Sequence, residues 1–242
     1  MIRALATIVS ILATSAASEC RHALALGLDV SGSVDSSEYR LQLGGLAGAL
    51  RRPEIKQLFL SNTANPVQIA IYEWSEPGHQ RLLLGWTAVQ SDLDLERIAT
   101  LLDHVKRSGA PQGTAVGSAM LFGAELLGQK PDCWKRTLDL SGDGKHNIGL
   151  HPRNAKQTLS DDGITINGLV IGADDPDIGS TRYVQVGELL AYFKAWVILG
   201  PGAFVEVALG FDDYEEAMTR KLIRELEGLT LSDAGQRPTK HQ

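Results

Sequence analysis

The sequence lacks the signatures of several large protein classes. No apolar run reaches about 18 residues, which argues against a permanent transmembrane helix. A glycine-rich phosphate loop with its lysine, an HExxH helix and a serine nucleophile elbow are all missing. The formal net charge of -6 argues against non-specific nucleic-acid binding and against a polybasic membrane-surface protein. No familiar catalytic motif therefore stands out.

Composition and patterning predict a globular α/β protein. The chain has 242 residues, of which 43% are hydrophobic and 21% charged, as is typical of soluble globular proteins. Strand-like and helix-like segments alternate along it. Strands are expected over 24–30, 67–74, 80–86, 134–141 and 164–171, with a further strand region over 196–207. Helices are expected over 36–50, 93–105, 115–127, 152–162, 187–194 and 211–226.

This order of segments predicts the architecture. The short turn Pro77-Gly78 joins two strands, which must then form an antiparallel hairpin. The alternation elsewhere predicts a doubly wound, mostly parallel sheet with one antiparallel edge strand and helices on both faces. We expect one domain over residues 19–228 and a disordered polar tail over 229–242.

The first 18 residues have the three regions of a secretory signal peptide. Met1-Ile2-Arg3 is a short positive start, Ala4–Ala13 is apolar, and Ala16-Ala17-Ser18 offers small residues for cleavage. The alternative is an ordinary first helix. The pattern favours a signal peptide over 1–18 and therefore a periplasmic or secreted protein.

The only two cysteines are Cys20 and Cys133. Each lies just ahead of an expected strand, nine or ten residues before Asp29 and Asp143 respectively. If those strands are parallel neighbours, both cysteines lie at the same end of the sheet, where a disulfide can form. Two free, buried cysteines are the alternative. We predict a structural disulfide at the end of the sheet opposite Asp29.

The apolar run from Leu24 ends in one carboxylate and two hydroxyls at alternate positions, Asp29, Ser31 and Ser33. Such a run is typical of a buried parallel strand, and ligand sites in open α/β sheets lie at the carboxyl ends of these strands. Oxygen donors without sulfur or imidazole suit Mg²⁺ or Ca²⁺ and not zinc. The alternative is that Asp29 and Ser31 cap the following helix.

Two later stretches favour the metal site. Gly113-Thr114 opens a middle helix, and Ser141-Gly142-Asp143-Gly144 ends a middle strand. Together with Asp29-x-Ser31-x-Ser33, in this order, they resemble the von Willebrand factor A-type domain and its metal-ion-dependent adhesion site. The resemblance extends over nearly all of residues 19–228. It implies metal ligands at Asp29, Ser31, Ser33, Thr114 and Asp143.

Three further stretches narrow the resemblance. The sequences of residues 29–42, 138–147 and 200–205 resemble those of a bacterial group of exported A-type domains with no assigned function. That resemblance implies a family and no particular activity.

The sequence departs from the A-type motif at the second aspartate. The A-type pattern there is Ser/Thr-Asp-Gly, whereas Gly142 intervenes between Ser141 and Asp143. The extra residue could displace the carboxylate, which would then act through a water. Asp139 lies inside the strand and competes for the same role. We prefer Asp143, because a glycine-containing strand end breaks the alternation that would orient Asp139.

Three functions remain in consideration. The expected ion is Mg²⁺, or Mn²⁺ or Ca²⁺. Because few carboxylates would bind it directly, it would keep enough positive charge to attract an anionic oxygen from another molecule. The first hypothesis is thus a binding module that recognises an Asp or Glu carboxylate of a protein or peptide. The second is a magnesium-dependent phosphoryl hydrolase with Asp29 as nucleophile. The third is a scaffold without metal. We expect the first. Several residues that follow Asp143 form the rim of the proposed site, where they either shape the choice of partner or are simply solvated: Lys145, His146, Asn147 and His151.

Overall fold

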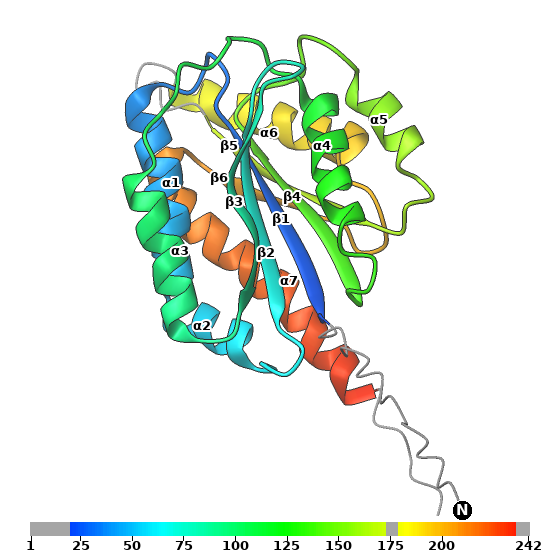
Figure 1. Ribbon diagram of the computed structural model, residues 1–242. Helices are drawn as coiled ribbons and strands as arrows, with labels where there is room; N and C mark the ends of the chain where they lie inside the picture. Colours follow the sequence, from blue (N-terminus) through cyan, green and yellow to red (C-terminus); the bar gives the residue numbers. More distant parts are fainter. Residues whose placement is uncertain (1–19, 173–178, 236–242) are drawn as a thin grey trace, which may run out of the picture.

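The protein folds around a six-stranded sheet, seen in a computed structural model that describes residues 20–172 and 179–235 (Figure 1). The strand order is β3-β2-β1-β4-β5-β6. All neighbours are parallel except β2 and β3, which form the antiparallel hairpin. The strands are β1 (His22–Asp29), β2 (Val67–Trp74), β3 (Gln80–Val89), β4 (Lys135–Gly142), β5 (Thr165–Ile171) and β6 (Val205–Ala208).

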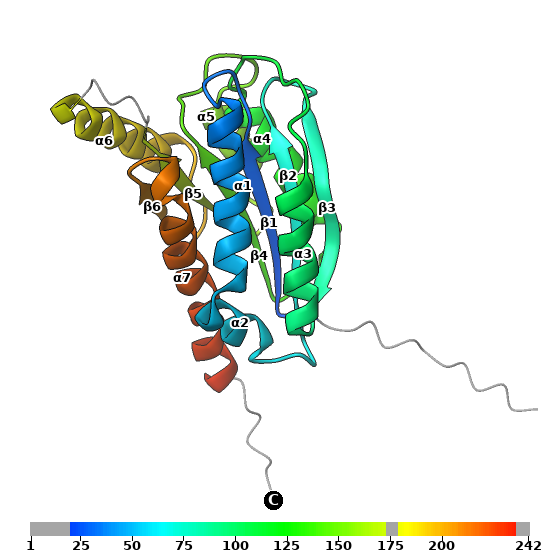
Figure 2. The same ribbon diagram turned by 90° about the vertical axis from the view of Figure 1, so that its left-hand side faces the viewer.

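Helices cover both faces of the sheet (Figures 1 and 2). One face packs against α1 (Ser36–Arg51), α2 (Pro53–Leu60), α3 (Asp92–His104) and α7 (Tyr214–Gly235). The other face packs against α4 (Val116–Gly128), α5 (Pro152–Thr158) and α6 (Gly179–Trp196). A short 3₁₀ helix, Phe211–Asp213, precedes α7. The doubly wound α/β fold predicted from the sequence is confirmed.

Strand β1 lies in the middle of the sheet and is buried along its whole length. Leu24, Leu26 and Leu28 face the core formed with α1 and α7, while Ala23 and Ala25 face α4. The alternation of large and small side chains follows from the two-residue period of a strand. The small residues give α4 and its neighbours a flat surface on which to pack.

The chain goes from β1 to β2 on one side and later returns to β4 on the other side of β1. The strand order therefore reverses between β1 and β4. In doubly wound sheets the crevice beside such a reversal, at the carboxyl ends of the strands, is the usual ligand site. Asp29 is the last residue of β1, and Asp143 directly follows β4.

The predicted disulfide joins Cys20 to Cys133, with 4.6 Å between their Cα atoms. Each cysteine lies just before one of the paired strands β1 and β4, at their amino ends. The backbone supports this pairing, because the Trp134 amide donates to the Cys20 carbonyl over 3.0 Å. The prediction of a structural disulfide at the end opposite Asp29 is confirmed.

Several elements differ from those expected: helix α2 was not expected, α5 ends at Thr158, and α6 begins at Gly179, eight residues before the expected start. Trp196 ends α6 and does not begin a strand, and the strand region is reduced to β6 with a single bridge at Leu199. Helix α7 continues through Gly235, so the first part of the tail predicted to be disordered over 229–242 is helical. The proposed signal peptide, residues 1–18, lies outside the described residues.

Candidate metal centre

Segments from three parts of the chain meet at the carboxyl ends of β1 and β4. The hydroxyl of Ser33, in the loop after β1, donates a 2.8 Å hydrogen bond to Oδ1 of Asp143, in the loop after β4. The hydroxyls of Ser31 and Ser33 lie 3.4 Å apart. The amide of Gly32 donates to the carbonyl of Gln112 over 3.1 Å, which brings the loop before α4 to the same place. The predicted residues of the first and last motifs are thus gathered together.

Asp29 is fully buried at the end of β1. Its Oδ1 accepts a 2.8 Å hydrogen bond from the Ser31 amide, whereas its Oδ2 has no hydrogen-bond partner in the described part of the chain. A Cβ at Gly142 would lie 3.2 Å from this Oδ2, so the glycine leaves space beside it. Burial raises the pKa of Asp29 well above its usual range, and the charge of Asp143 raises it further.

Asp143 is the second carboxylate of the cluster. Burial raises its pKa, while the hydrogen bond from Ser33 acts in the opposite direction. Burial and mutual repulsion disfavour the charged forms of two neighbouring carboxylates, and a proton or a cation between them removes this penalty. The cluster is therefore electrostatically incomplete without one of these.

Thr114 lies against the loop that follows Asp143. Its amide donates to Oδ1 of Asn147 over 2.8 Å, and the Asn147 amide donates to its carbonyl over 3.1 Å. A Cβ at Gly144 would lie 3.8 Å from the Thr114 hydroxyl oxygen. Thr114 is buried, at 4% exposure, just before helix α4. All five residues predicted as ligands thus lie at the end of β1 or on the three loops that meet here.

The helix-capping alternative for Asp29 and Ser31 is wrong. The residue that caps α1 is Asp35, whose carboxylate accepts from the amides of Ser37 (2.6 Å) and Glu38 (2.9 Å). The Glu38 carboxylate in turn accepts a 2.7 Å hydrogen bond from the Asp35 amide, which completes a capping box. The carboxylate of Asp29 and the hydroxyl of Ser31 are not used by the helix.

Asp139 lies away from this cluster, on the α7 side of the sheet. It forms a buried ion pair with Lys221, and Lys221 also contacts Glu225 at 2.9 Å. Asn167 adds a 2.7 Å hydrogen bond to Glu225. Burial and the charge of Glu225 raise the pKa of Asp139 to about 7. Of the two aspartates considered from the sequence, only Asp143 contacts the Asp29–Ser33 loop.

Two residues that position Thr114 were not recognised as such from the sequence. Glu76, just after β2, accepts a 2.9 Å hydrogen bond from the Gly113 amide through Oε1. Asn147, which was considered only as a rim residue, holds the Thr114 backbone through the two hydrogen bonds between them. Their partners are remote in the chain, so no local pattern marks either role.

The rest of the predicted rim has structural partners. Lys145 forms a 2.9 Å ion pair with Glu188 of α6, and the Nδ1 of His151 accepts from the Arg153 amide at the start of α5. The ring of His146 lies 5.3 Å from that of His151. These contacts fix the loop after β4 to helices α5 and α6.

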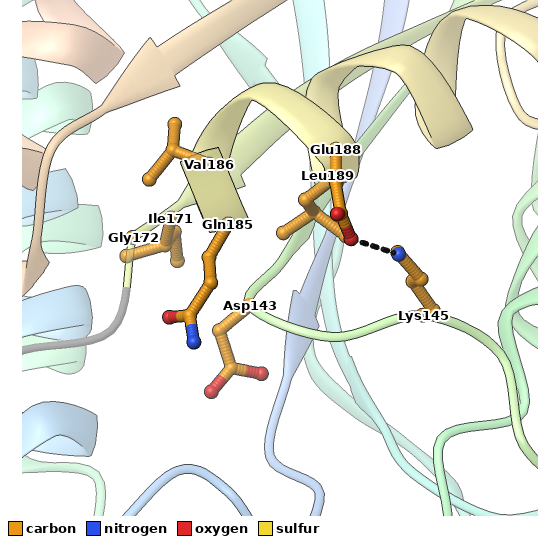
Figure 3. A pocket seen from close by; sticks show the side chains of 8 residues that line it. All are labelled: Asp143, Lys145, Ile171, Gly172, Gln185, Val186, Glu188 and Leu189. Atoms are coloured by element: carbon orange, nitrogen blue, oxygen red, sulfur yellow. Dashed lines mark hydrogen bonds and ion pairs between the residues drawn. The ribbon is translucent and has the colours of Figure 1, made fainter. Parts of the chain in front are cut away.

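A pocket of about 210 Å³ adjoins the cluster, between the loop after β4 and α6 (Figure 3). Asp143 and the amide of Gln185 lie near each other at its polar side, and the Lys145–Glu188 ion pair lies at another edge. Ile171, at the end of β5, adds an apolar wall. The cluster is thus open to a ligand from this direction.

The donor chemistry fits a hard divalent cation. Two carboxylates and three hydroxyls provide only oxygen ligands, which is the set that Mg²⁺ and Ca²⁺ prefer. The unpaired, buried Oδ2 of Asp29 is the specific sign of a missing partner. Within the described residues no three His, Cys, Asp or Glu side chains gather in a metal-binding arrangement. No helix in the same residues is both long and apolar enough to cross a membrane.

Comparison with solved structures places the fold among von Willebrand factor A-type domains. Proximal thread matrix protein 1 from the mussel byssus is 17% identical with a TM-score of 0.59, over 86% of this chain and 46% of that one. A second structure of it, described as having a zinc-occupied MIDAS motif, is 15% identical with a TM-score of 0.58, over 86% and 46%. The von Willebrand factor type A protein from Catenulispora acidiphila is 17% identical with a TM-score of 0.56, over 86% and 43%.

The pilus adhesin SpaC from Lactobacillus rhamnosus GG also shares the fold, at 15% identity and a TM-score of 0.59, over 87% of this chain and 30% of that one. The chain thus spans less than half the length of each of these structures. At such low identity these likenesses establish the fold alone.

Comparison of sequences gives the family. No curated protein matches the chain. One family model matches residues 19–230, which includes the whole of the domain expected over 19–228. The chain belongs to the family described as "Protein of unknown function (DUF1194)".

Proposed function

We propose that this protein is an exported, metal-dependent binding module that recognises an acidic group on a protein or peptide through a divalent cation. Mg²⁺ is the expected ion, with Mn²⁺ or Ca²⁺ as alternatives. The A-type fold and the gathered oxygen donors support this function. The adhesin and the structure with a zinc-occupied MIDAS motif among the similar proteins agree with it.

The observation that carries the proposal is the buried carboxylate of Asp29. Its Oδ2 is unpaired in the described part of the chain, and the neighbouring Asp143 raises the pKa of this carboxyl. Leaving a buried ionised oxygen without a partner costs several kcal/mol, on the order of the penalty for desolvating a charge. A cation held between the two carboxylates removes this cost.

Each predicted ligand has a distinct role in the proposal. Asp29 and Asp143 supply negative charge, directly or through water, and Ser31, Ser33 and Thr114 supply neutral hydroxyls. The bound ion keeps part of its positive charge because few anionic ligands surround it, and it therefore favours one further carboxylate from a partner. Affinity for the partner would come from this contact together with the surrounding surface.

Calorimetric titration of the purified chain with Mg²⁺ and Mn²⁺ tests the proposal. The wild type is expected to bind one ion, and Asp29→Asn and Asp143→Asn are expected to lose binding. Asp132→Asn is the matched control, because Asp132 is exposed beside Cys133 at the opposite end of the sheet. Circular dichroism establishes that each variant is folded.

Two results would contradict the proposal. One is a wild-type protein that binds neither ion at millimolar concentration. The other is turnover of p-nitrophenyl phosphate that disappears in Asp29→Asn, which would identify the hydrolase considered from the sequence. Export is tested separately by intact mass of the protein made in a bacterial host, where cleavage after Ser18 is expected.

A further inference from the structure

We propose that the partner carries more than one acidic group, and that a basic groove beside the metal centre binds the second. This inference rests on the proposed function for the first acidic group. The groove lies between the start of α1 and the residues that follow α3, and it has a volume of about 440 Å³. The name "basic groove" denotes the surface lined by Tyr39, Arg40, Asp103, Lys106 and Arg107.

The groove lies at the same end of the molecule as the metal centre. Helices α1 and α3 stand side by side, and α1 begins just after the loop that carries Ser33 (Figure 2). Arg107 donates a hydrogen bond from Nη2 to the carbonyl of Val34, the residue that follows Ser33. The groove and the centre therefore share one loop, and a single extended segment could contact both.

The positive charge of the groove is available to a ligand. Arg40 and Lys106 are exposed, Arg107 is half-buried, and no ion pair among residues 20–172 and 179–235 involves any of the three. Arg40 lies over the ring of Tyr39, at 5.1 Å from its centroid, and donates to the backbone carbonyl of Asp103 over 3.1 Å. These contacts orient the guanidinium without neutralising it.

Asp103 is the acid among the residues that line the groove, and Asp35 and Glu38, beside it at the start of α1, form the capping box of that helix. The carboxylate of Asp103 forms a 2.8 Å ion pair with Arg51. Glu73, behind the groove, is almost fully buried, accepts from the Tyr39 hydroxyl, and pairs with Arg81 at 2.7 Å. Among the residues that line the groove, the three cations Arg40, Lys106 and Arg107 thus outnumber the one carboxylate, on a chain whose net charge is -6.

The observations favour an acidic protein segment over a long polyanion. The overall negative charge repels an extended polyanion such as a nucleic acid or a sulfated polysaccharide, because its contacts would extend beyond the groove. A segment with a few carboxylates could place one at the metal centre and another at Arg40 and Lys106. The groove contribution should weaken as salt increases, since its cations are solvent-exposed.

A labelled short oligo-glutamate peptide is the probe, with binding followed by fluorescence anisotropy in the presence of Mg²⁺. The double variant Arg40→Glu/Lys106→Glu is expected to weaken binding about tenfold or more. Its calorimetric affinity for Mg²⁺ should equal that of the wild type, because neither side chain contributes to the centre. The control double variant Lys56→Glu/Lys130→Glu, with Lys56 on α2 and Lys130 near Cys133 at the opposite end of the sheet, makes the same charge change away from the groove and should bind as the wild type does.

The outcomes separate this inference from the proposed function. Equal binding of the oligo-glutamate peptide by the double variant Arg40→Glu/Lys106→Glu and the wild type would overturn the proposal for the groove and leave the proposal of Mg²⁺ binding intact. Tighter binding of heparin than of the oligo-glutamate peptide, lost in that double variant, would overturn the acidic protein segment in favour of a sulfated polymer. Failure of the wild type to bind Mg²⁺ in calorimetry would instead remove the proposed function.

Discussion

Ser33 and Asp143 are joined by a 2.8 Å hydrogen bond although 110 positions separate them in the chain. The bond exists because β1 and β4 are parallel neighbours, so the loops that follow them leave the same edge of the sheet. It orients the carboxylate of Asp143 toward the loop that carries Ser31. The relationship links the two motifs that define the candidate metal centre.

Replacing Ser33 by alanine should therefore weaken metal binding without unfolding the protein. The change removes one hydroxyl ligand and the hydrogen bond that orients Asp143, and we expect a loss of about tenfold in Mg²⁺ affinity, or ~1.4 kcal/mol. Calorimetric titration measures the effect. Ser36→Ala, an exposed serine at the start of α1, is the control and should bind as the wild type does. Unchanged affinity in Ser33→Ala would show that this hydroxyl is not a ligand.

The buried group of Asp139, Lys221 and Glu225 predicts a pH dependence of stability. The folded pKa of Asp139 is raised to about 7 from an ordinary value of 3.8, so the folded state holds this proton more tightly than the unfolded chain. The stabilisation from Asp139 is present below about pH 4 and is lost as the pH rises through about 7. Glu225 remains as a partner for Lys221 at 2.9 Å.

The variant Asp139→Asn tests that dependence, because asparagine imitates the protonated side chain at every pH. Its free energy of unfolding relative to the wild type should increase between pH 5 and pH 8, by an amount on the order of 2 kcal/mol. Urea denaturation at both pH values measures it. Asp132→Asn is the comparison, and it should show no such change. A difference between Asp139→Asn and the wild type that is constant with pH would contradict the prediction.

Two glycines of α4 should respond oppositely to alanine. A Cβ at Gly117 would lie 2.0 Å from the carbonyl oxygen of Leu150, whereas one at Gly128 would meet nothing within 4 Å. Gly117→Ala must displace the loop after β4 and is expected to destabilise the protein by about 2 kcal/mol. Gly128→Ala should be neutral or slightly stabilising, because alanine favours helix. Thermal unfolding compares them, and equal melting temperatures would refute the argument.

The disulfide should affect stability and not metal binding. It joins Cys20 and Cys133 across a separation of 113 residues, at the end of β1 and β4 opposite the candidate centre. Cys20→Ser/Cys133→Ser is expected to lose about 2–5 kcal/mol of unfolding free energy with unchanged Mg²⁺ affinity. Reductant should produce the same loss in the wild type and no effect in the variant. A variant as stable as the wild type would contradict this expectation.

The fold was predictable because its signals are local. Continuous apolar runs mark the buried strands, and Pro77-Gly78 marks the hairpin. The predicted element boundaries were less accurate where the same residues suit both a helix and a strand. Trp196 is aromatic and has apolar neighbours in the sequence, which suits a strand, but it packs near His151 and ends α6. Tertiary packing decided that segment.

The candidate centre was predictable in part. Asp29, Ser31 and Ser33 follow a recognisable strand, so their common position could be read from the sequence. The role of Asp139 could not, because its partner Lys221 lies on α7 and no local pattern connects the two. The same holds for Asn147 and Glu76, which hold the loop of Thr114 from two other segments.

The sequence by itself determined the kinds of element, the oxygen donors and the pair of cysteines, because each depends on residues close together in the chain. Only the tertiary structure decided which donors meet. Strand order brings the ends of β1 and β4 together, which sets Asp143 beside Ser33, and the packing of α7 on the sheet pairs Asp139 with Lys221. These arrangements arise from contacts between remote segments, which a pattern of neighbouring residues does not encode.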